Sequence, residues 1–281
     1  MDSHTLTGGQ LISFKHQLRS EEREQSTIEK YIREVRFFTH WLAGRPITAE
    51  MVANWKNYLR DEGYKPETIN SKLSALNKFF KSVGRQELRI KYLKIQRKLF
   101  RDTEKELTKE EYLRLLETAN HLGRTRLALL IETICATGIR VSEVRYITAE
   151  AVRAGRADIA LKGKIRTVLL PGKLCRKLQK YAKKEKITSG ELFLTRSGKG
   201  ISRRQIWAEM KALCKKANVV PSKVFPHNLR HLFARTFYRV CRDVAKLADV
   251  LGHSSIETTR IYLISTGVEH ARQLERLGLI S

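Results

Sequence analysis

Two short stretches in the second half of the sequence carry charged side chains suited to a phosphate ester. In ATGIRVSEV, Arg140 and Glu143 are three residues apart, which places both side chains on one side of a helical turn. In LKGK, Lys162 and Lys164 flank a glycine in a hairpin turn signal. A guanidinium binds phosphate oxygens through two parallel hydrogen bonds, and a lysine can protonate a leaving oxygen. These stretches therefore supply an anion-binding group and an acid.

Two further stretches supply imidazoles, a second guanidinium and a phenol. In PHNLRHLFA, His227, Arg230 and His231 follow an i, i+3, i+4 pattern and can project from one helix face. In LGHSSIETTRIYL, His253 precedes Tyr262 by nine residues. A tyrosine hydroxyl, with an ordinary pKa of about 10, is a weak nucleophile alone. A nearby base and concentrated positive charge would favour its phenolate.

Together these groups match phosphodiester transesterification without a metal ion. The attacked phosphodiester passes through a five-coordinate state whose charge lies on the non-bridging oxygens, and aimed donors stabilise that state. The sequence shows no acidic cluster of the kind that binds Mg²⁺, so we expect neither a metal nor a cofactor. Taken one at a time, each group also fits a structural role: an ion pair, a solvated turn, a polar helix face or a packed tyrosine.

The two histidines of PHNLRHLFA also have the four-residue spacing of zinc metalloprotease helices. In those helices a glutamate follows the first histidine and acts as general base. Asn228 occupies that place here, and no third ligand is evident, although catalytic zinc needs three protein ligands. The spacing is therefore a weak indication of metal-dependent hydrolysis.

The charge of the chain indicates its class of partner. Its 281 residues include 55 Lys plus Arg against 29 Asp plus Glu, a net charge of +26, and both halves are basic. Because 42% of the residues are hydrophobic, a packed core is feasible and wholesale disorder is disfavoured. A folded protein with this charge indicates a polyanionic partner, most often nucleic acid. The alternative is a solvated basic surface without a specific partner.

The sequence gives no indication of a membrane or secretory role. Its four cysteines form no C-x-x-C pair, which disfavours a zinc ribbon or a disulfide framework. The N-terminus, MDSHTLTGGQ, lacks the basic and then apolar build of a signal peptide. The apolar stretch 127–139 is too short to span a bilayer and contains Glu132. We expect a cytoplasmic protein with free thiols and no membrane partner.

Helical periodicity dominates the first part of the chain. Helices are predicted within 9–42, 47–63 and 65–84, with N-caps at Ser26 or Thr27 and at Thr48. We place a helical domain of about four helices at residues 1–95. A charged linker follows at 96–106.

The second domain is expected at residues 107–281. It opens with a capping box, in which Thr108 is followed by Glu111. Residues 156–172 predict a β-hairpin, and ELFLT at 191–195 could add a third short strand. The remainder is expected to be helical. The fold class is therefore mainly α, with a small antiparallel sheet in the second domain.

The motifs ATGIRVSEV, PHNLRHLFA and LGHSSIETTRIYL, in this order and spacing, resemble the signature motifs of the tyrosine recombinases, the phage integrase family. The resemblance covers the whole chain and implies a SAM-like core-binding domain, a linker and a catalytic domain. It implies these roles: Tyr262 as nucleophile, Arg140, Arg230, His227 and His253 as catalytic groups, Lys162 as general acid, and Glu143 as the support of Arg140. Lys164 stays a rival to Lys162, because the turn is shortened.

The chain departs from the family pattern at two positions of the second motif. Asn228 replaces a common aspartate and Leu232 replaces a common threonine. Neither is a reacting group, so we expect tuning and not loss of activity. Helices are expected from about residue 9, so the arm-binding domain of larger integrases is not expected, and the resemblance is to the simpler, Xer-like recombinases.

The resemblance implies site-specific recombination of double-stranded DNA through a 3′-phosphotyrosyl intermediate, without ATP or a metal. Two duplexes and paired cleavages imply a homotetramer on DNA. The amphipathic tail 268–280 either packs on its own domain or docks on a neighbouring protomer. A topoisomerase-like or hairpin-resolving enzyme is the alternative function, and a non-catalytic DNA-binding regulator is a third hypothesis.

Overall fold

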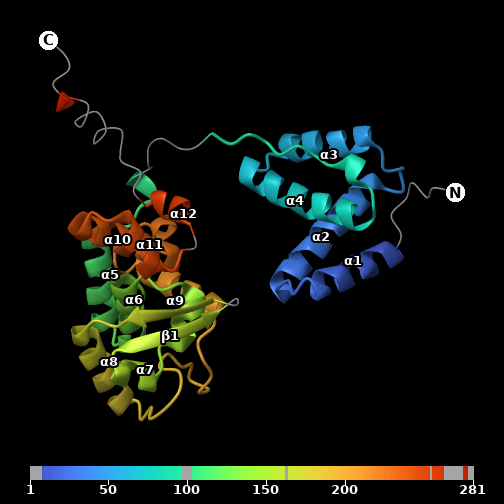
Figure 1. The fold of residues 1–281 in the computed structure, drawn as a ribbon. Coiled ribbons are helices and arrows are strands. Elements are labelled where there is room, and N and C mark those ends of the chain that lie inside the picture. The colour runs from blue at the N-terminus through green and yellow to red at the C-terminus, as the bar shows by residue number, and fades with distance from the viewer. Residues whose placement is uncertain (1–7, 97–102, 162–163, 254, 263–274, 278–281) are drawn as a thin grey trace. The chain divides into compact units, whose positions relative to one another are not determined.

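The computed structural model of the protein describes residues 8–96, 103–161, 164–253, 255–262 and 275–277. The chain divides into two compact units, Met1–Arg97 and Lys98–Ser281, which are called unit 1 and unit 2 below (Figure 1). The division falls inside the stretch 96–106, where we expect a linker. Each unit is described by itself.

Among its described residues, unit 1 contains helices joined by loops and no strand. Its elements are α1 (Gly8–Ser20), α2 (Gln25–Leu42), α3 (Ala49–Asp61), α4 (Pro66–Ser82) and the 3₁₀ helix η1 (Gln86–Leu88). The predicted cap of α3 is confirmed, since the Thr48 hydroxyl accepts from the backbone N–H of Met51 at 3.1 Å. The cap expected at Ser26 or Thr27 is wrong. Helix α2 begins at Gln25, before both of these residues, and its N-cap, Glu24, makes no side-chain cap bond.

The core of unit 1 is built from aromatic and aliphatic side chains. Phe14 packs edge-on against Phe79 with ring centroids 5.3 Å apart, and Phe38 against Trp55 at 5.5 Å. All four rings are at most 1% exposed. These contacts join α1, α2, α3 and α4 around one apolar centre, as the helical periodicity predicts.

Unit 2 is mainly helical and contains one small sheet. Its elements are η2 (Thr103–Lys105), α5 (Lys109–His121), α6 (Thr125–Thr137), η3 (Val141–Tyr146), α7 (Ala149–Ala154), β1 (Arg156–Leu161), β2 (Lys164–Leu169), α8 (Gly172–Lys184), α9 (Arg203–Cys214), η4 (Pro221–Lys223), α10 (Pro226–Cys241), α11 (Val244–Leu251) and α12 (Ile256–Arg260). The capping box of α5 is confirmed in both directions, at 3.2 Å to Thr108 and 2.9 Å to Glu111. The fold class expected from the sequence is confirmed.

The predicted hairpin is present. Strands β1 and β2 pair antiparallel, from Arg156 opposite Leu169 to Leu161 opposite Lys164. The third strand expected at 191–195 is wrong, because this segment makes only isolated bridges, at Glu191 and Leu194. Leu192 and Phe193 are both buried in the core, whereas a strand sends successive side chains to opposite faces.

Helix α6 is the central element of unit 2, packing against α5, α8 and α10. It is buried on most sides, from Leu127 to Ile134, so that its carboxyl end is fixed inside the unit. No helix in the described part of the chain is long and apolar enough to cross a membrane. The tail 268–280 lies outside the described residues except for 275–277, so its expected helix and docking stay predictions.

Candidate active site

A glycine at the end of α6 directs the chain into the first motif. Gly138 caps α6 in the left-handed region, with φ of +65°. A Cβ there would overlap the Phe233 ring of α10, so a larger residue would separate the two helices. The turn therefore brings Arg140 to the surface where α6 meets α10.

Arg140 and Glu143 form a reciprocal pair. The backbone N–H of Arg140 donates to Glu143 Oε2 at 2.7 Å, and its Nη1 donates to Oε1 at 3.0 Å. Residues Val141–Tyr146 form a 3₁₀ helix, and Arg140 is its N-cap. The Arg140 side chain is 40% exposed and that of Glu143 is 2% exposed. An anion arriving from solvent can therefore reach Arg140, while the buried carboxylate holds this arginine from behind.

Arg230 lies buried between the carboxyl ends of two helices. Its Nη1 donates to the carbonyl of Gly138, after α6, and its Nη2 donates to the carbonyl of Leu251, at the end of α11, at 2.7 Å. The last carbonyls of a helix have no partner inside it and carry partial negative charge. Arg230 satisfies one such carbonyl from each helix, which explains how a guanidinium is tolerated at 2% exposure.

His253 follows α11 and contacts Arg230 directly. Its Nε2 is 2.9 Å from Arg230 Nη2, and its Nδ1 is 2.9 Å from the Thr259 hydroxyl. Because a guanidinium only donates, Nε2 accepts and Nδ1 carries the proton. Burial first, and then Arg230 and Arg140, lower the pKa of His253 to about 4, so the ring is neutral at pH 7.

Tyr262 lies in the same cluster. It is 4% exposed, and its ring stacks on His253 with centroids 5.8 Å apart. Its ring also meets His231 edge-on at 4.5 Å and lies 6.4 Å from His227. The Tyr262 hydroxyl lies close enough to Arg230 to act on the pKa of that arginine. Tyr262, the nucleophile expected from the sequence, therefore lies beside a buried positive charge.

The charges of the cluster depress the pKa values of its members. Burial, Arg230 and Arg140 lower the pKa of His227, and burial followed by His227 lowers that of His231 to about 3. Burial and Arg140 lower the pKa of Arg230 to about 10, with Tyr262 acting in the opposite direction. The cluster therefore contains neutral imidazoles next to positive guanidiniums at pH 7.

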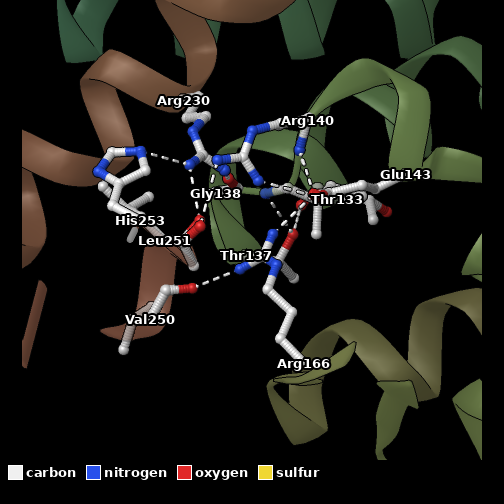
Figure 2. A network of polar contacts seen from close by, with 12 residues as sticks. Thr133, Thr137, Gly138, Arg140, Glu143, Arg166, Arg230, Val250, Leu251 and His253 are labelled. Atoms are coloured by element: carbon white, nitrogen blue, oxygen red, sulfur yellow. Dashed lines mark hydrogen bonds and ion pairs between the residues drawn. The ribbon is translucent and has the colours of Figure 1, made fainter. Parts of the chain in front are cut away.

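Glu143 remains ionised in this environment. Burial acts to raise its pKa, but the backbone N–H of Arg140 and the guanidiniums of Arg166 and Arg140 outweigh burial, so its pKa is lowered. Arg166, on β2, was not among the candidates from the sequence. Its Nη2 donates to Glu143 Oε2 at 2.6 Å and its Nη1 to the Val250 carbonyl at 2.7 Å. Figure 2 shows Arg140, Arg166 and Arg230 approaching Glu143 and the end of α11.

The alternation of side chains along β2 explains why sequence patterning did not identify Arg166. Val168 is 5% exposed and the Arg166 side chain 15%, while Ile165 is 82% exposed and Leu169 is 76% exposed. Alternate positions of a strand share a face, so Arg166 accompanies Val168 toward the interior. Hydrophobicity alone favours the opposite assignment, with Ile165 and Leu169 inward.

The structure brings six of the expected site residues together: Arg140, Glu143, His227, Arg230, His253 and Tyr262. Lys162 lies outside the described residues, and nothing is described of the Lys164 side chain at the start of β2. The choice between the two lysines therefore stays a prediction. Within the described ranges, no group of three or more His, Cys, Asp or Glu is arranged to hold a metal ion.

The two departures from the motif have structural reasons. Asn228 is 6% exposed, and its Nδ2 donates to the carbonyls of Lys105 and Lys223, both at 2.8 Å. A carboxylate could make neither bond, so the amide is the group that this position requires. Leu232 is 8% exposed and belongs to the apolar core of unit 2.

Two models of known protein families match this chain, one in each of its two units. Residues 105–267 match the phage integrase family, and residues 11–87 match the phage integrase N-terminal SAM-like domain. This chain belongs to the phage integrase family. The first match contains Arg140, Arg230, His253 and Tyr262, so the converging residues lie within the part that defines the family.

Relatives from archaea match over nearly the whole length of the chain. Tyrosine recombinase XerA of Pyrococcus furiosus is 29% identical over 290 residues, covering 100% of this chain and 98% of the relative. Tyrosine recombinase XerA of Thermococcus kodakarensis is 31% identical over 271 residues, covering 93% and 92%. Both units of this chain therefore have counterparts in these relatives.

A solved structure shares the fold at lower identity. The crystal structure of a lambda integrase tetramer bound to a Holliday junction matches with a TM-score of 0.73 and 19% identity. The match covers 92% of this chain and 78% of that one. The family fold therefore persists where most residues differ.

Proposed function

We propose that this protein is a site-specific DNA recombinase that cuts and rejoins DNA strands by transesterification. The observation that carries the proposal is the convergence of two arginines, a neutral histidine and a tyrosine from separate segments of unit 2. Arg230 contacts His253 and lies beside Tyr262, and Arg140 lies at the solvent side. The similarity to relatives named tyrosine recombinases supports this reaction over the topoisomerase-like alternative.

In the proposed first step, the Tyr262 oxygen attacks a DNA phosphorus atom. A bond forms between the phenol oxygen and phosphorus, and the bond from phosphorus to the 5′-oxygen breaks. Lys162, or Lys164 in its place, donates the proton that leaves on the 5′-hydroxyl. Arg140 and Arg230 stabilise the charge on the non-bridging oxygens, with Glu143 supporting Arg140.

The two histidines have supporting roles in this proposal. His253, with a pKa of about 4, is neutral and fixes Arg230 through its acceptor nitrogen. His227, whose pKa is also lowered, is neutral at pH 7 and can accept the phenol proton. In the second step, the 5′-hydroxyl of a partner strand attacks the phosphotyrosine and releases Tyr262. One phosphodiester replaces another, so no energy source is consumed.

The proposed substrate is double-stranded DNA, held by a homotetramer at two paired sites. The charge of +26 fits a duplex partner, and the similar lambda integrase is a tetramer on a Holliday junction. Exchange of the tail 268–280 between protomers is part of the same proposal, as are the division into a core-binding domain, a linker and a catalytic domain and a place in the cytoplasm, where such DNA lies.

Covalent trapping on nicked DNA tests the proposal. The protein is incubated with duplexes of randomised sequence that carry a nick, so that the short 5′-hydroxyl fragment released by cleavage diffuses away. Wild-type protein is expected to accumulate a denaturant-resistant adduct, and sequencing of the trapped DNA gives the target. Tyr262→Phe should bind the recovered sequence and form no adduct. An adduct at another residue, or none with wild type, would contradict the proposal.

A further inference from the structure

Arg166 occupies a central place in the polar network without contacting Tyr262. Its side chain is 15% exposed, and its two terminal nitrogens donate to Glu143 and to the carbonyl of Val250. The first bond joins β2 to η3, and the second joins β2 to the end of α11. One side chain thus connects η3, which follows Arg140, the hairpin strand β2, and the end of α11, which precedes His253.

Three successive carbonyls at the end of α11 each accept from a different arginine. Arg166 donates to Val250 and Arg230 donates to Leu251, the latter at 2.7 Å (Figure 2). Arg140 donates to Gly252 at 3.4 Å. Val250 and Leu251 are the last residues of α11 and Gly252 is its C-cap, and carbonyls at the end of a helix have no partner inside it. The end of α11 therefore fixes the positions of the three guanidiniums relative to one another, and His253 follows Gly252 in the chain.

The surroundings of Arg166 indicate that it acts on its neighbours and does not bind phosphate itself. Both terminal nitrogens already donate to protein acceptors. Its Nε is buried without a partner among the described residues and lies against Gly252, where a Cβ would come within 2.8 Å of it. Gly252, with φ of +64°, is the residue that leaves room for this side chain.

We propose that Arg166 is a positioning residue for strand cleavage. It holds the Glu143 carboxylate in place against the end of α11, and through Glu143 it fixes the direction of Arg140. Through Val250 it fixes the start of the segment that carries His253. This inference rests on the proposed function, because it assigns Arg166 a part in the same reaction.

The expected consequence is a loss of rate without a matching loss of binding. Arg166→Ala should lower the single-turnover rate of covalent adduct formation about 10- to 100-fold, the effect of a small misplacement of reacting groups. Its Kd for the recovered DNA sequence should stay within about twofold of wild type, since both terminal nitrogens of Arg166 already donate to protein acceptors. Arg166→Lys should recover part of the rate, because an ammonium can pair with Glu143 but cannot also reach Val250 as a planar fork.

Arg126→Ala is the matched control. Arg126, on α6 in the same unit, also joins a carboxylate, Glu209, to a backbone carbonyl, that of Leu194, but it is outside the polar network. Its loss should lower the melting temperature without changing the cleavage rate of the folded protein. If Arg166→Ala and Arg126→Ala behave alike at equal folded fractions, Arg166 is merely structural and the inference is overturned.

A double-mutant cycle with Glu143→Gln tests the route of the effect. If Arg166 acts through Glu143, the double variant should cleave about as slowly as the slower single variant. Multiplied rate losses would overturn the proposed route. Failure of wild type to form any adduct would instead overturn the proposed function, so the two failures are distinguishable.

Discussion

Among the residues that the structure describes, each unit contains one buried carboxylate that is paired with two cations, and the two clusters differ in what those cations contact. In unit 1, Glu34 is 6% exposed and accepts from Lys72 at 2.6 Å and from Arg33 at 2.9 Å. Lys72 also lies over the ring faces of Phe37 and Tyr64. The cluster therefore ends in an aromatic surface.

In unit 2, Glu143 is 2% exposed and is paired with Arg140 and Arg166. Both arginines continue to the end of α11, where Arg230 and His253 lie. Burial and double pairing are thus the same for the two carboxylates. The two carboxylates differ in whether their partners contact further reactive groups. A buried ion pair therefore identifies a functional site only together with the residues around it.

Removing the more exposed arginine beside each carboxylate, Arg140 beside Glu143 and Arg33 beside Glu34, tests this contrast most strongly. Arg140→Ala should lower single-turnover cleavage about 100- to 1,000-fold, as does loss of one aimed donor in a charged transition state. Arg33→Ala should leave the rate unchanged, because the Arg33 side chain is 71% exposed and supports only Glu34. Adduct formation on the nicked duplex measures both. A normal rate for Arg140→Ala would remove the distinction between the two carboxylates.

The sequence was sufficient for groups whose positions depend on local spacing. Arg140 with Glu143 and His227 with Arg230 are close because they are three residues apart, and Thr48 and Thr108 cap helices for equally local reasons. Arg166 could not be found in this way, since its partners are 23 and 84 residues away in the sequence. The inward direction of its side chain depends on the register of β2. A sequence motif also gives no information on backbone acceptors such as the carbonyls of α11.

As the pH is lowered, unit 2 should begin to lose stability at a higher pH than unit 1. His253, at about pKa 4, and His227 have folded-state values below the ordinary 6.5. The unfolded chain then binds more protons, so the stability that these residues contribute is complete above pH 6.5 and is lost as the pH falls from 6.5 toward 4. The pKa of Glu34 is lowered from 4.5, so its contribution in unit 1 is lost only below that range.

Hydrogen exchange of each unit at pH 7 and pH 5 measures this difference. Unit 2 should lose on the order of 1 kcal/mol of protection through His253, after allowance for its partial exposure. His253→Gln removes one titrating group and should reduce the pH dependence of unit 2 in part, because His227 and His231, whose pKa values are also lowered, still titrate. Equal losses in both units would show that the buried histidines do not control acid stability.

The smallest expected effects come from the helix caps, where the two units should be alike. Thr48 in unit 1 and Thr108 in unit 2 each accept from a backbone N–H at an exposed helix start, at 3.1 and 3.2 Å. Thr48→Ala and Thr108→Ala should each cost roughly 0.5–1 kcal/mol of unfolding free energy, the lower part of the range for caps. Denaturant unfolding measures the cost, and cleavage by the folded fraction should be unchanged for both. A large loss of cleavage in Thr108→Ala alone would mean that the site depends on the amino end of α5, and the contrast between the units would then extend beyond the network around Glu143.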